Sequence, residues 1–143
     1  MFETLVTGTL LISATVVIQT AGVMLLARVM TRVVRWFRLH RHNLGRTVAM
    51  VVTVLGLFAM HTLEIWLWAI VYYRDRVTRT FEDALYISTA SFSTQGSQEM
   101  IALNWRLLAA LESVNGFILI GWSIAFLIAA STRFGPFRAG EHF

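Results

Sequence analysis

Three long apolar runs constrain what this chain can fold into more than any other feature of its sequence. Residues 5–27 and 113–132 contain no charged residue, and residues 47–73 contain only His61 and Glu64 as basic or acidic side chains. Each run reaches the roughly 20 residues that a helix needs to cross the ~30 Å hydrocarbon core of a bilayer. We therefore predict an all-α integral membrane protein with three transmembrane helices.

The remaining composition narrows the classes of function. Only 14% of the 143 residues are charged, and three spanning helices leave too few residues for a soluble catalytic domain. The absence of cysteine excludes disulfides and thiolate metal sites. An enzyme would need a convergent group of acids and histidines, or a nucleophile with its base, and His61 with Glu64 is too little for either. We expect neither an enzyme nor a bound cofactor.

A basic link joins the first two runs. Its arginines recur mostly every three or four residues, which is helical spacing, at Arg28, Arg32, Arg35, Arg38, Arg41 and Arg46. Such a segment is either a voltage-sensor helix or an amphipathic helix in the headgroup layer, with Trp36 and Phe37 dipping inward. A voltage-sensor helix needs acidic side chains on neighbouring helices to pair with its arginines, and the first run has none after Glu3. This favours the amphipathic helix. We expect anionic lipid, and no nucleic acid, to contact Arg28–Arg46, and Gly45 to cap the helix.

The same arginines predict the orientation, because the densest positive cluster belongs on the cytoplasmic side. The N-terminus would then lie outside and the C-terminus in the cytoplasm of a multi-pass protein of the cell inner (plasma) membrane. Gln19 is the only strongly polar residue inside the first run, and we expect it to bond to another helix.

Polar side chains in the second and third runs gather at one depth. His61 and Glu64 are three residues apart and share a helix face that Trp68 continues. They would either brace the loop that follows or act directly as an ion ligand or proton sensor. Glu112 and Asn115 lie a turn or two into the helix that contains the third run, within reach of the loop or of His61.

The connection between these two runs is too polar and too short to span a bilayer. Thr80 with Asp83 predicts a capping box, and a helix over residues 81–92 would be ~18 Å long, half the bilayer. Its C-terminal end would carry partial negative charge and favour a cation. The next residues suit an extended climb whose carbonyl groups face an axis: Ser93, Thr94, Gln95, Gly96 and Ser97.

This pattern predicts a re-entrant pore helix and a selectivity-filter loop. Backbone oxygens of Thr94, Gln95 and Gly96 would bind a monovalent cation, K+ or Na+, as the permeant ion. One copy of the loop cannot encircle an ion, so we expect a homotetramer with the loops around its axis. Gln98 and Glu99 would form the outer mouth, where acidic side chains concentrate cations.

The residues also resemble the two-helix pore module of the bacterial potassium-channel superfamily. The resemblance covers about residues 47–133 and is carried by HTLEIWLWA (61–69), FEDALY (81–86), SFSTQG (91–96), WRLL (105–108), LE (111–112) and GWSIAFL (121–127). It implies a homotetrameric pore. The family filter reads Thr-Val-Gly-Tyr-Gly-Asp, whereas residues 94–99 read TQGSQE, without the tyrosine and the second glycine. We therefore predict weak or absent potassium selectivity.

The resemblance divides the chain into three parts. Residues 1–46 hold the added helix and link, residues 134–143 form a short cytoplasmic tail, and residues 47–133 form the pore domain. Its parts are the outer helix (47–73), pore helix (81–92), filter (93–99) and inner helix (105–132). Gly116 and Gly121 would allow a gating bend or close packing, and Phe126 and Ala130 would line the inner mouth or pack on the second helix. The alternative function is a non-conducting or regulatory membrane subunit that keeps this scaffold.

Overall fold

A computed structural model describes residues 2–36, 43–96 and 101–134 of the chain. Throughout these residues the regular structure is helical, in four elements: α1 (Phe2–Trp36), α2 (Asn43–Arg74), α3 (Phe81–Phe92) and α4 (Arg106–Phe134). Helices α1, α2 and α4 are long and apolar enough to cross a membrane, over Phe2–Arg32, Thr47–Arg74 and Arg106–Arg133. The prediction of an all-helical chain with three potential spans is confirmed.

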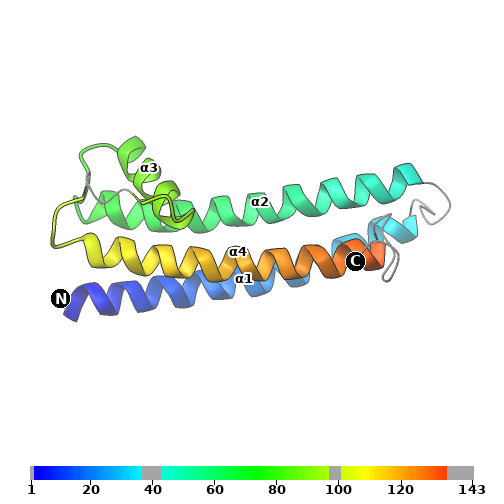
Figure 1. Ribbon diagram of the computed structural model, residues 1–143, viewed down its shortest axis with the longest axis horizontal. Coiled ribbons are helices and arrows are strands. Elements are labelled where there is room, and N and C mark those ends of the chain that lie inside the picture. Colours follow the sequence, from blue (N-terminus) through cyan, green and yellow to red (C-terminus); the bar gives the residue numbers. More distant parts are fainter. Residues whose placement is uncertain (1, 37–42, 97–100, 135–143) are drawn as a thin grey trace.

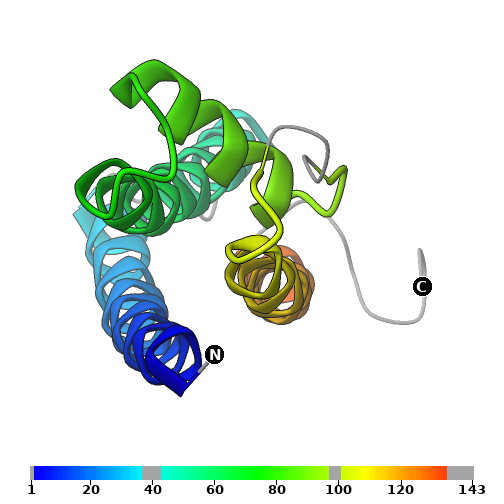
Figure 2. The same cartoon turned by 90° about the vertical axis from the view of Figure 1, so that its left-hand side faces the viewer.

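The three long helices lie side by side along the length of the molecule (Figure 1). Short α3 packs at one end, the end that holds the start of α1, the end of α2 and the start of α4. Seen along the bundle, α1, α2 and α4 occupy three corners, and α3 crosses from α2 to α4 on the side away from α1 (Figure 2). We call this end the α3 end. We call the opposite end, which holds Arg28 and Arg32 of α1 and Arg133 of α4, the arginine end.

The basic link differs from the prediction. Helix α1 does not stop near residue 27 but continues to Trp36, so the first arginines of the link extend the same helix. Arginine is a good helix former, and no glycine or proline interrupts this stretch. The expected cap at Gly45 is wrong, because α2 already begins at Asn43. Residues 37–42, the middle of the link, lie outside the described residues.

Two apolar clusters hold the bundle together. At the α3 end, Trp68 and Tyr72 of α2 pack with Ile87 of α3 and Leu108 of α4, and Leu11 of α1 joins them. Nearer the arginine end, Leu26 of α1 packs with residues of α2 in a smaller cluster. Many other large apolar side chains are exposed along the three long helices, as expected for surfaces that meet lipid or another chain.

Polar side chains join α1 to α4 in the interior. The Gln19 amide donates to Ser123 Oγ at 2.9 Å and to the Leu119 carbonyl at 3.3 Å. One turn away, Asn115 Nδ2 donates to Thr15 Oγ1 at 2.9 Å. The prediction that Gln19 bonds to another helix is confirmed. Asn115, expected near the loop or His61, instead bonds to α1.

Candidate functional site

The start of α3 is fixed by its first residues. Thr80, with φ −120° and ψ 155°, accepts a hydrogen bond from the Asp83 backbone N–H through its side chain, at 3.1 Å. Its hydroxyl also donates to Asp83 Oδ2 at 2.7 Å, so the Asp83 side chain returns to the Thr80 side chain. Asp83 and Glu82 add negative charge at the positive end of the helix dipole.

The end of α3 lies deep against the two neighbouring helices. A Cβ atom added at Gly116 would stand 2.3 Å from the Phe92 carbonyl oxygen, so only glycine fits there. The Phe92 ring lies 5.5 Å from the His61 ring, between centroids. Gly116 is ~15 Å along α4 from its start, at ~1.5 Å per residue. The C-terminal end of α3 therefore lies about a third of the way along α4, beside His61 of α2.

Glu112 ties α3 to both long helices. It is fully buried, and its Oε2 accepts a hydrogen bond from the Tyr72 hydroxyl of α2 at 2.5 Å. Its Oε1 lies 2.5 Å from the Ser88 hydroxyl of α3, which also lies 2.8 Å from the Ile65 carbonyl. We call Tyr72, Ser88 and Glu112 the Glu112 cluster. It gives each carboxyl oxygen a partner from a different helix, which holds α3 in one position.

His61 and Glu64 form a second group on α2. His61 Nδ1 lies 2.8 Å from Glu64 Oε2, and the His61 side chain is 17% exposed whereas that of Glu64 is fully buried. Among the described residues, neither Glu64 Oε1 nor Trp68 Nε1 has a hydrogen-bond partner. We call His61, Glu64 and Trp68 the Glu64 group. It contacts α3 through Phe92, and it does not include Glu112.

Sequence reasoning grouped Glu112 with these residues and missed its actual partners. Ser88 lies four residues from Ala84 and from Phe92, all buried on one face of α3. Tyr72 lies one turn after Trp68 on α2. These positions signal two polar groups on apolar faces that need partners. Glu112 meets Ser88 across a separation of 24 positions in the sequence and Tyr72 across 40 positions, and the spacing within one helix does not predict such contacts.

The chain after α3 does not make the expected extended climb. The backbone N–H groups of Ser93, Thr94 and Gly96 donate to the carbonyls of Thr89, Ser91 and Ala90. Thr94 and Gly96 have φ of 62° and 82° and complete a tight turn back over the helix end. Thr94 takes a left-handed conformation that glycine adopts more easily. The expectation of an extended filter is wrong for residues 93–96.

This turn is open on its outer side. Ser93, Thr94, Gln95 and Gly96 are all exposed, and apart from Gly96 and its two chain neighbours no described atom lies within 4 Å of a Cβ built at Gly96. The rest of the expected filter and outer mouth, Ser97, Gln98 and Glu99, lies outside the described residues. Within the described part of the chain, no group of three acidic or histidine side chains is placed to hold a metal ion.

The residues expected at a gate pack in different ways. Gly116 serves the close contact with α3 described above, whereas Gly121 is exposed with open space around it. Phe126 packs on the apolar cluster of α1 and α2, and Ala130 is buried. Helix α4 runs unbroken through both glycines.

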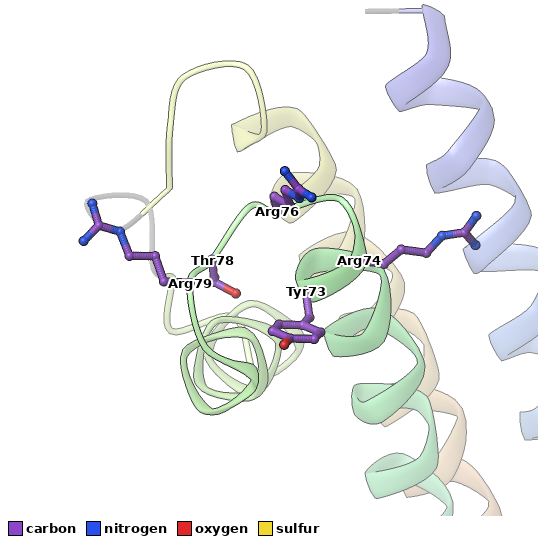
Figure 3. Close-up of a pocket in the computed structure, with 5 residues that line it drawn as sticks. All are labelled: Tyr73, Arg74, Arg76, Thr78 and Arg79. Atoms are coloured by element: carbon purple, nitrogen blue, oxygen red, sulfur yellow. The ribbon is translucent and has the colours of Figure 1, made fainter.

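Arginines also gather at the α3 end, but they do not converge. A hollow of about 530 Å³ is lined by Tyr73, Arg74, Arg76, Thr78 and Arg79. The three guanidinium groups point in different directions around it (Figure 3). Arg76 has φ 55°, in the turn that ends α2. This arrangement does not form a site in which several cations hold one anion.

Comparisons of the chain with protein families, with curated proteins and with solved structures found no match. The function is therefore inferred from the geometry of the helices and of the polar groups around α3.

Proposed function

We propose that the chain forms a homotetrameric cation channel for monovalent ions, K+ or Na+. The position of α3 carries the proposal: a capped short helix whose C-terminal end lies ~15 Å along one potential membrane span and packs against a second. The partial negative charge of that end favours a cation. The exposed polar residues that follow it cannot face lipid at this depth, because lipid offers no hydrogen bonds. They require water or a neighbouring subunit.

Four copies around one axis meet that requirement. They would surround the turns of residues 93–96 with protein and leave a hydrated centre, and irregular backbone at membrane depth is tolerated only in such surroundings. The Glu112 cluster supports this assembly because it fixes the depth and direction of each α3. The proposed orientation puts the α3 end outside and the arginine end in the cytoplasm, in the cell inner membrane.

Weak selectivity follows from the same residues. A filter that strips water from K+ needs several rings of carbonyl groups held in register. Here the N–H groups of the turn bind back to the end of α3, and the residues after Gly96 lack the glycine and tyrosine of a potassium filter. We expect K+ and Na+ to permeate with similar ease.

The folded-back turn also favours one other candidate, a non-conducting or regulatory membrane subunit. The carbonyls of Thr89, Ala90 and Ser91 already accept hydrogen bonds from the turn. If the turn keeps this form in the assembly, the chain retains the scaffold of a channel without a row of free carbonyl groups.

Flux and accessibility together test the proposal. The chain contains no cysteine, so Thr94→Cys introduces a single thiol at the turn, and Thr20→Cys on the exposed face of α1 is the matched control. We expect purified wild-type protein in liposomes to pass K+ and Na+. A charged thiol reagent should abolish flux through Thr94→Cys and leave flux through Thr20→Cys unchanged.

Three outcomes would separate the candidates. A tetramer without flux would favour the non-conducting subunit. A monomer without flux would end both proposals. Flux that survives modification at residue 94 would place the ion path elsewhere in the bundle.

A further inference from the structure

A groove between α1 and α2 is left open by small side chains. Its volume is about 450 Å³, and its lining includes Ala21, Gly22 and Leu25 of α1 with Gly56, Ala59 and Leu63 of α2. A dry apolar cavity of about 150 Å³ already accommodates benzene, so this groove has room for part of an acyl chain.

The groove is not a loose contact that the two helices could close. A Cβ atom at Gly22 would stand 2.0 Å from Met60 Sδ, and one at Gly56 would stand 2.7 Å from Leu26 Cδ1. The side chains of Met60 and Leu26 therefore already fill the space beside the two glycines, at the floor of the groove. Ala21 and Ala59 are exposed at the rim, where their short side chains leave the space open.

Two exposed arginines mark one end of the groove. Leu25 and Val29 of α1 line the groove. Arg28 lies three residues after Leu25, and Arg32 lies three residues after Val29, so both arginines extend the face of α1 that lines the groove. Long arginine side chains reach along an apolar surface to a polar layer. Within the described part of the chain, no carboxylate lies within salt-bridge distance of either guanidinium.

The charge of this end argues for an anionic occupant other than a second copy of the chain. No acidic residue lies between Glu3 and Glu64, so a parallel copy would bring arginines toward arginines. A phosphate group is a natural partner for guanidinium donors.

We propose that this groove binds one anionic phospholipid, with an acyl chain between α1 and α2 and the phosphate held by Arg28 and Arg32. The site needs only that the helices span a membrane, so it does not depend on ion conduction. It narrows the broad expectation of lipid contact along the basic link to a defined pocket and two arginines.

Native mass spectrometry of the full chain, released from micelles containing phosphatidylglycerol or phosphatidylcholine, tests this site. We expect wild-type protein to retain phosphatidylglycerol in preference to phosphatidylcholine. Replacing Arg28 and Arg32 together by glutamine should weaken retention at least tenfold. Arg74→Gln with Arg79→Gln, at the α3 end, is the charge-matched control and should retain the lipid.

Two further variants keep the test decisive if the glutamine variant folds poorly. Arg28→Lys with Arg32→Lys keeps the charge and should retain most of the binding. Ala59→Phe fills the rim and should reduce retention without changing the charge. Equal retention of the two lipids, or unchanged retention in Ala59→Phe, would overturn the proposal. Cross-linking of Ala21→Cys between copies would overturn it in favour of a second chain in the groove.

Discussion

Glu112 of α4 and Glu64 of α2 are both fully buried, but the Glu112 cluster and the Glu64 group provide them with different numbers of hydrogen-bond partners. Both oxygens of Glu112 have partners, one from α2 and one from α3. Glu64 has one partner, His61 of its own helix, and its other oxygen has none among the described residues. A buried polar group without a partner is costly. Glu64 therefore has an oxygen that could still accept a hydrogen bond or bind a ligand, whereas both oxygens of Glu112 already have partners.

The two carboxyl groups therefore differ in how many helices they join. Glu112 joins three helices and leaves no oxygen for another ligand. Glu64 joins nothing beyond one turn of α2, and it lies one residue before the Ile65 carbonyl that Ser88 contacts. The sequence suggested that His61 and Glu64 either brace the loop or act directly as an ion ligand. The contacts of a brace are those that Glu112 makes, more than those that Glu64 makes.

The largest expected effect comes from removing each carboxyl in turn. Glu112→Ala leaves the Tyr72 hydroxyl without its acceptor and opens a cavity, so we expect it to lower the free energy of unfolding by about 3 kcal/mol. Glu64→Ala opens a cavity of the same size, but it removes one local contact together with a buried oxygen that has no partner, so the loss should be smaller, about 1 kcal/mol. Unfolding of both variants in mixed micelles, followed by circular dichroism, measures the difference. Equal losses would remove the distinction between the two residues.

A smaller effect tests whether α3 is held where the Glu112 cluster puts it. Gly116→Ala forces the Phe92 carbonyl away from α4, and overpacking of this kind costs about 1–3 kcal/mol. Gly121→Ala is the control on the same helix, because nothing lies within 4 Å of the added methyl group. It should be neutral or stabilising by up to about 1 kcal/mol, since alanine favours helix. Thermal unfolding in detergent should rank the variants in this order, and the reverse order would show that α3 packs elsewhere.

The smallest effect isolates one hydrogen bond of the cluster. Tyr72→Phe removes the hydroxyl and keeps the ring, and interhelical hydrogen bonds in membranes contribute about 0.6 kcal/mol on average, up to about 1.7. We expect a loss in that range. Combining Tyr72→Phe with Glu112→Ala should cost little more than Glu112→Ala alone, because the bond is already gone. Fully additive losses would mean that the two side chains do not interact.

Sequence alone could predict the helices because their signals are local. Charge-free runs of spanning length predict α1, α2 and α4, and Thr80 predicts where α3 begins. The end of α1 was predicted too early because a change from apolar to arginine looks like a boundary, although nothing there stops a helix.

The partners of Glu112 and the course of the chain after Phe92 could not be predicted, for a different reason. The sequence placed Glu112 within reach of the loop or of His61. That it meets Ser88 instead depends on how α4 is rotated against α3, and the two helices pack closely at Gly116. The turn after Phe92 likewise depends on which carbonyl groups the helix end leaves open. Neither the rotation of α4 nor the set of open carbonyl groups can be predicted from the spacing of residues along one segment.

The hydrogen bonds from Gln19 and Asn115 that link α1 and α4 have a mechanical consequence. If α4 tilts or rotates, α1 must move with it or lose these three hydrogen bonds, each at a modest cost at membrane depth. Helix α1 is thereby coupled to the helix that would border the proposed pore. A force applied to α1 from the bilayer reaches α4 directly, without passing through α2.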